Sequence, residues 1–84
     1  MTDLEKRELH KHSYANKSAI MLSTYVGCFY CKRIFLPNKI TEFIKEKDGG
    51  ETAICPYCNI DSVLPSVVQE LNQNVLTEMH DFYF

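Results

Sequence analysis

Four cysteines form two pairs with identical spacing, and they are the residues of this 84-residue chain best suited to chemistry. Cysteines three positions apart in a tight turn point both sulfurs at one spot. Two such turns facing each other make a tetrahedral all-thiolate site, the geometry that zinc prefers. The pattern C-x2-C-x23-C-x2-C therefore predicts one structural Zn²⁺ per chain, held by Cys28, Cys31, Cys55 and Cys58.

The residues around the cysteines bear on the shape of the two turns. Pro56 fits a metal-binding turn because it fixes the backbone just after the first ligand of its pair. Asn59 suits the left-handed conformation that often follows such a turn, whereas Lys32 at the equivalent place suits it less. We therefore expect the first turn either to be looser or to have its geometry carried by Phe29 and Tyr30. Lys32 and Arg33 are placed to offset the charge of four thiolates.

Other readings of the cysteines remain open. They could be buried thiols without a metal, or one pair could be a redox centre, although two pairs flanked by short strands do not resemble a thioredoxin-like arrangement. A mononuclear iron site uses the same ligands, and "CPYC" resembles the second knuckle of rubredoxins. Rubredoxins usually carry glycine after each pair, so zinc is preferred. A site with four protein ligands leaves no position for substrate, so we expect no enzyme.

Size and composition predict one small folded domain. The apolar share is 45% and the aromatic share 12%, which is typical of globular chains, but so short a chain rarely buries enough surface without a staple. The N-terminus lacks the apolar stretch of a signal peptide, and no segment reaches the roughly 18 apolar residues of a membrane span. We expect a cytoplasmic protein with no membrane partner, where thiols stay reduced and serve as ligands.

The pattern predicts an α+β fold in which short hairpins and two to three helices surround the metal. Residues 1–15 are expected to be a charged helix or a frayed tail, and residues 16–84 a single zinc-binding domain. Within it we expect a helix from Asn16 that ends at Gly27, a helix over residues 37–47, and a turn at "DGG". Short strands should flank the cysteine pairs in "RIFL", "TAI" and "IDSVL". A helical turn near residues 67–71 and a last helix capped by Asn74 should follow.

Three stretches together resemble a known family: "GCFYCKRIFLPNKITEFI", "TAICPYCNIDSVLP" and "LTEMHDFYF". They are similar to short bacterial and phage proteins described as cytoplasmic proteins, which carry G-C-F-Y-C, F-x-P-x-x-I-x-x-[WF]-I, T-A-[IL]-C-P-x-C-G-[IV]-D-S-V-[IL] and M-H-x-[YF]-[WF]-F. The resemblance runs from about residue 16 to residue 84. It implies a zinc-ribbon-like or treble-clef-like fold with the four cysteines as ligands, and it implies no activity. Asn59 departs from the family's glycine.

Two binding functions are compatible with the sequence. The first is a zinc-stabilised module that binds another protein, because the acidic C-terminal part and the aromatic tail "HDFYF" could serve an interface. The second is nucleic-acid binding, because Lys32, Arg33, Lys39, Lys45 and Lys47 could gather near the first cysteine pair. A pI near 5.8 and interleaved acids weaken it. Electron transfer through iron is a third reading.

The residues expected to contact a partner lie near the first cysteine pair and at the end of the chain. Phe29 and Tyr30 could stack against a partner. His80 is expected to be a surface or partly packed histidine, and it is the replacement ligand if one cysteine does not bind. The candidate partner-binding residues are Phe29, Tyr30, Lys32, Arg33, His80, Tyr83 and Phe84.

Overall fold

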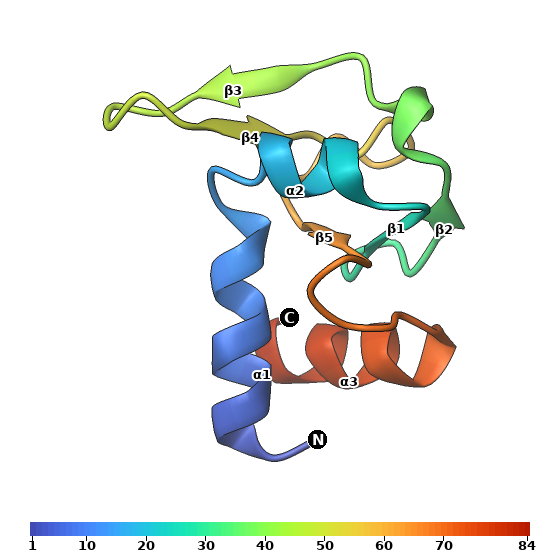
Figure 1. The fold of residues 1–84 in the computed structure, drawn as a ribbon. Coiled ribbons are helices and arrows are strands. Elements are labelled where there is room, and N and C mark those ends of the chain that lie inside the picture. Colours follow the sequence, from blue (N-terminus) through green and yellow to red (C-terminus); the bar gives the residue numbers. More distant parts are fainter.

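The computed structural model describes residues 1–84 and shows two small antiparallel sheets surrounded by helices (Figure 1). Three strands pair in the order β2-β1-β5, and β3 and β4 form a separate hairpin. The elements in chain order are α1 (Asp3–His10), η1 (Lys11–Ser13), α2 (Lys17–Leu22), β1 (Val26–Cys28), β2 (Ile34–Phe35), η2 (Pro37–Lys39), β3 (Phe43–Lys45), β4 (Glu51–Ala53), β5 (Val63–Pro65) and α3 (Gln73–Tyr83). The predicted α+β class, short hairpins and helices are confirmed, whereas the zinc-ribbon-like type stays a prediction.

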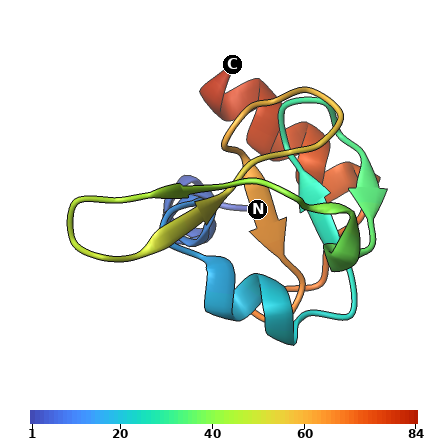
Figure 2. The same cartoon turned by 90° about the horizontal axis from the view of Figure 1, so that it is seen from above.

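The three-stranded sheet separates two apolar cores because alternate residues of a strand face opposite sides. In β5, Val63 belongs to a core with the cysteines, whereas Leu64 belongs to a core with helices α1 and α3. Gly27 allows close packing on the second side, since a Cβ there would lie 3.2 Å from the side chain of Leu76. The sheet therefore has the buried cysteines on one side and the terminal helices on the other. In Figure 2 helix α3, drawn in red, lies behind strand β1.

The helix predicted for residues 37–47 is wrong. One turn of 3₁₀ helix, η2, is followed by strand β3, in which Ile44 pairs with Thr52 of β4. Aromatic and β-branched residues such as Phe43 and Ile44 favour strands. The turn at "DGG" reverses the chain between β3 and its partner strand β4. Gly49 has φ 94°, and the Asp48 side chain accepts a hydrogen bond from the Gly50 N–H. The predicted turn is confirmed, and the two acids Glu42 and Glu46 do not share a helix.

The helix that follows Asn16 ends at Leu22 and not at Gly27, which lies inside β1. Ser23 ends it, because the Ser23 hydroxyl donates to the Ala19 carbonyl and accepts from the Val67 N–H. Asn16 does not cap this helix with its side chain. Its amide instead joins three segments, donating to the carbonyls of His12 and Val63 and accepting from the Ala53 N–H.

The ends of the chain pack together. Helix α1 carries a capping box formed by Thr2 and Glu5, and Leu9 is buried in the core beneath α3. Residues 67–71 form no helix, contrary to the prediction; a single turn closes here, in which the Val68 N–H donates to the Pro65 carbonyl. Helix α3 is present but begins two residues early, because Asn72 and not Asn74 caps it by accepting a hydrogen bond from the Val75 N–H. α1 and α3 thus share one core with the sheet.

Candidate metal centre

The two cysteine turns have the same backbone structure, and we call them knuckle 1 (Cys28–Cys31) and knuckle 2 (Cys55–Cys58). In knuckle 1 the Cys28 N–H donates to the Arg33 carbonyl, and the Lys32 N–H donates to the Cys28 carbonyl. In knuckle 2 the Cys55 N–H donates to the carbonyl of residue 60, and the N–H of residue 59 donates to the Cys55 carbonyl. Each knuckle therefore holds its two cysteines by the same pair of hydrogen bonds.

The residue after each knuckle adopts the left-handed conformation, with φ 65° at Lys32 and 63° at Asn59. The expectation that the first turn is looser is therefore wrong. The hydrogen bonds on either side of Lys32 impose the same geometry on it as on Asn59.

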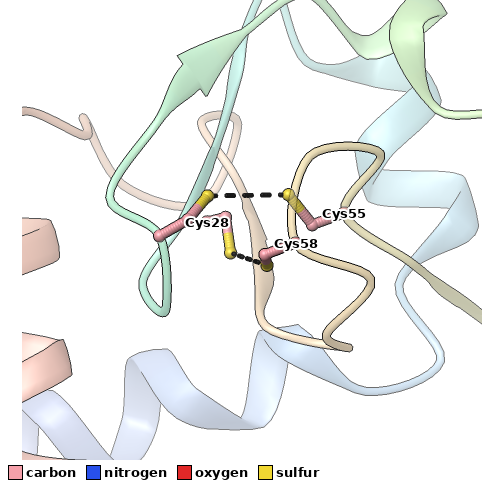
Figure 3. A group of neighbouring side chains, drawn as sticks. Cys28, Cys55 and Cys58 are labelled. Atoms are coloured by element: carbon pink, nitrogen blue, oxygen red, sulfur yellow. Dashed lines mark hydrogen bonds between the residues drawn. The ribbon is translucent and has the colours of Figure 1, made fainter.

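Strands deliver the knuckles to one point. Knuckle 1 connects β1 to β2, and knuckle 2 lies between β4 and β5, which pairs with β1. Val63 of β5 faces Cys28 of β1 in the sheet register. This pairing brings the two loops face to face, and Figure 3 shows their side chains pointing inward.

The spacing of the four sulfurs fits a tetrahedral metal. The Sγ atoms lie 3.6 Å apart for Cys28 and Cys58 and 3.7 Å apart for Cys31 and Cys55, and all four lie within 4.8 Å of one another. Zinc–sulfur bonds of about 2.3 Å make a tetrahedron with edges of about 3.8 Å. A disulfide needs sulfurs about 2.05 Å apart, and all four cysteines are free. The cluster is thus a metal-binding arrangement of four thiols.

Hydrogen bonds favour ionisation at one corner of the cluster. Burial opposes the charged form of Cys28, but hydrogen bonds from the Ser62 hydroxyl and from the backbone N–H groups of Cys31 and Tyr30 outweigh it, so the pKa of this thiol lies below its usual value. The Ser62 oxygen lies 3.4 Å from the Cys28 sulfur. Polar groups that orient a ligand in this way stabilise the charged, metal-binding form.

The neighbouring sulfurs resist further ionisation in the absence of a cation. Burial and the adjacent Cys28 raise the pKa of Cys31 to about 11, and the same two influences raise the pKa of Cys58. Crowded thiolates repel one another, and a divalent cation removes this penalty by sharing their charge. Metal binding should therefore release protons from the cluster.

The predicted basic residues do not form one cluster. The Arg33 guanidinium lies over the Tyr57 ring, 4.7 Å from its centroid, and so connects the two knuckles. Lys45 ends strand β3, and Lys47 lies in the turn of the hairpin, which extends away from β2 in Figure 2. These two lysines therefore lie away from knuckle 1.

The predicted partner-binding aromatics meet at the end of α3. Phe29 is buried, whereas Tyr30 is 43% and Phe84 60% exposed. The rings of Tyr30 and Phe84 meet edge to face at 4.8 Å, and His80 lies 5.7 Å from Phe84. His80 is not part of the cysteine cluster and lies 3.3 Å from Asp81. It therefore lies outside the candidate metal centre.

Three contributors were missed at the sequence level. Ser62, which contacts Cys28, lies in "DSV" and has no spacing signal of its own. Tyr57 occupies the same place in knuckle 2 as Tyr30 in knuckle 1, and the doubled pattern "xYC" could have paired them. His10 stacks on Tyr83 at 4.0 Å, and no local pattern links residues so far apart in the chain.

Comparisons with protein-family models, with curated proteins and with solved structures find no match to this chain. The resemblance to the bacterial and phage proteins therefore stays a prediction. No helix of the structure has both the length and the apolar character required to cross a bilayer.

Proposed function

We propose that this chain is a zinc-stabilised module that binds another protein and performs no catalysis. The cysteine cluster carries the first half of the proposal, because four thiolates complete the coordination of a tetrahedral ion and leave no position for substrate. In this role the metal ties β1, β4 and β5 together. Reduced thiols are required, so we place the protein in the cytoplasm of a bacterium or of a phage-infected cell.

Zinc is preferred over iron, and metal analysis separates them. We expect one zinc per chain and a colourless solution when untagged protein is analysed by plasma mass spectrometry and absorption spectroscopy. Because structural zinc contributes roughly 10–16 kcal/mol in small domains, Cys55→Ser should lose the metal and the cooperative thermal transition. Stoichiometric iron with a red colour would instead indicate an electron carrier. A Cys55→Ser variant that kept its zinc content and melting temperature would contradict a metal centre.

The exposed aromatic rings support the second part of the proposal, that the chain binds another protein. We call Tyr30, His80 and Phe84 the aromatic face. The edge-to-face contact of Tyr30 with Phe84 holds both rings in place while they remain accessible, so little entropy is lost when a partner covers them. Rigid exposed aromatics dominate binding hot spots between proteins. This surface, next to knuckle 1, is the best-supported place for a partner.

Nucleic-acid binding is less well supported. Arg33 is held over Tyr57, Lys17 lies 3.4 Å from Glu51, and Lys11 lies 3.0 Å from Glu8, so several cations already have local partners. The formal charge of −2 would fall to about −4 with a Zn²⁺ bound by four thiolates. A protein of this charge lacks the basic footprint that attracts a phosphate backbone.

The test compares partner capture by matched variants. Zinc-loaded protein should retain a specific protein from a nuclease-treated lysate of the encoding organism, and purification of that partner should allow its affinity to be measured by calorimetry. Phe84→Ala should weaken the affinity by about tenfold or more, as expected of a hot-spot residue. Leu22→Ala, which truncates a side chain 75% exposed on α2, is the control and should not. Equal affinities of the two variants, or retention of a protein from an untreated lysate but not from the nuclease-treated one, would overturn the proposal.

A further inference from the structure

A cavity of about 330 Å³ lies next to the aromatic face, between the end of α1, the end of α3 and the chain that leaves knuckle 2. Its apolar wall is built from the rings of His10, Phe29, Tyr83 and Phe84, and Asp61 and Ser62 supply polar groups. Binding pockets for small molecules span roughly 300–1,000 Å³, so this volume suits a single side chain better than a whole cofactor. No cysteine lines the cavity, although Ser62 contacts both the cavity and Cys28.

The four rings contact one another and form a continuous aromatic surface. His10 stacks on Tyr83 with centroids 4.0 Å apart, and Phe29 lies 6.0 Å from Tyr83 and 5.8 Å from Phe84. Phe29 is buried and belongs to the core, so the surface is anchored in the fold. Aromatic faces carry negative potential and attract cations within about 6 Å of a ring centroid.

Asp61 adds a full negative charge to the cavity. Its side chain is exposed, and the structure shows neither an ion pair nor a hydrogen bond to it, in contrast to Asp48 and Glu51, which have partners. Asp61 also lies three residues after Cys58, and its neighbour Ser62 contacts Cys28. A zinc centre with four thiolates carries a net charge of −2, which makes the potential around Asp61 more negative.

We propose that this cavity binds an arginine side chain of the partner protein. A guanidinium group is planar, stacks on aromatic rings and pairs with a carboxylate through two parallel hydrogen bonds, so one group satisfies both the rings and Asp61. The same chain already holds the Arg33 guanidinium over the Tyr57 ring. His10, which lines the same cavity, has its ring stacked on Tyr83. The assignment rests on the proposed protein-binding function and defines the chemistry of the partner.

The test uses N-acetyl-arginine amide as the probe and zinc-loaded, ¹⁵N-labelled protein. We expect saturable shifts of the amide resonances of Ser62 and Phe84, with a dissociation constant on the order of a few millimolar for one isolated side chain. N-acetyl-citrulline amide has the same shape without the charge and should not produce these shifts. Citrulline binding as tight as arginine, or tighter binding of N-acetyl-lysine amide, would overturn the assignment.

Matched variants separate Asp61 from general electrostatics. Asp61→Asn should weaken arginine amide binding by about fivefold or more, because it removes the charge and keeps the shape. Glu70→Gln removes one charge from another exposed position and should leave binding unchanged. Equal weakening by both variants would overturn the assignment. If partner capture depends on Phe84 but arginine amide does not bind, this inference fails while the proposed function stands.

Discussion

Lys32 and Asn59 occupy equivalent places after the two knuckles and share the left-handed conformation, with φ 65° and 63°. The backbone hydrogen bonds of the two knuckles also match one to one. The structure therefore repeats one metal-binding turn, although the residue types that complete it differ. Asn tolerates this conformation better than Lys, so the strain is greater in knuckle 1.

Replacing Lys32 by glycine should stabilise the zinc-loaded protein. Glycine removes the Cβ clash of the left-handed conformation, and we expect a gain of about 1 kcal/mol in the free energy of unfolding, with a smaller gain for Asn59→Gly. Urea denaturation at fixed zinc concentration measures both. Lys45→Gly, in a strand with ordinary φ, should instead destabilise the protein. A loss of stability in Lys32→Gly would contradict this prediction, because it would show that the Lys32 side chain stabilises the fold by more than the strain costs.

Ser62→Ala should weaken zinc binding without unfolding the protein. The buried Ser62 hydroxyl lies 3.4 Å from the Cys28 sulfur and helps to lower its pKa. Removing a group that orients a ligand typically costs about 10–100-fold in metal affinity. Competition with a chromophoric chelator measures the change. Ser66→Ala, which lies beyond β5, serves as the control, and equal affinities of the two variants would contradict a role for Ser62.

The knuckles could be predicted because their determinants are local. Identical spacing of the cysteine pairs indicated a common site, and the "DGG" turn, the strands in "RIFL", "TAI" and "IDSVL" and the last helix followed from nearby residue types. Strand β1 was not predicted, because its residues were assigned to the end of the helix that follows Asn16. The helix predicted for residues 37–47 failed although Leu36, Ile40, Phe43 and Ile44 have helical spacing. In the structure Ile40 is buried while Leu36 and Ile44 are exposed, so the spacing did not mark one buried face. Pairing of β3 with β4 decided the conformation.

The surface beside the cysteine cluster depends on contacts between distant parts of the chain. The stacking of His10 on Tyr83 requires α1 and α3 to meet, and neither helix has a pattern that specifies the other. Asn16 shows the same limit: it has a helix-capping residue type, but its amide is used by β4, β5 and η1. A local sequence pattern predicts only contacts with nearby residues, so the long-range contacts of His10 and Asn16 could not be predicted.

Asn16→Ala should be among the more destabilising substitutions outside the cysteines. Asn16 is 4% exposed, and its side chain satisfies the Ala53 N–H and the Val63 carbonyl, which would otherwise lack these partners. A buried unsatisfied group costs about 1–3 kcal/mol, so we expect a loss of about 2–4 kcal/mol in the free energy of unfolding. Thermal and urea denaturation measure it. Asn38→Ala, at an exposed position in η2, should change stability by less than about 0.5 kcal/mol, and comparable losses would contradict the bridging role.

Tyr14 should make stability depend on pH on the alkaline side. Desolvation and the nearby carboxylates of Asp48 and Glu46 raise the pKa of Tyr14, whose hydroxyl donates to Asp48 at 3.3 Å. The folded state thus holds the Tyr14 proton more tightly than the unfolded state does. The resulting stabilisation is complete below about pH 10, the usual tyrosine pKa, and is lost as the pH rises through the pKa of Tyr14 in the folded state. Titration of the Tyr14 ring carbon by NMR measures the folded pKa. Asp48→Asn should lower the pKa of Tyr14, because it removes the charge but keeps an oxygen that can accept from the Gly50 N–H. The control Glu70→Gln, at a distant position, should leave this pKa unchanged. Equal pKa values in both variants and in the unchanged protein would show that Asp48 does not act on Tyr14.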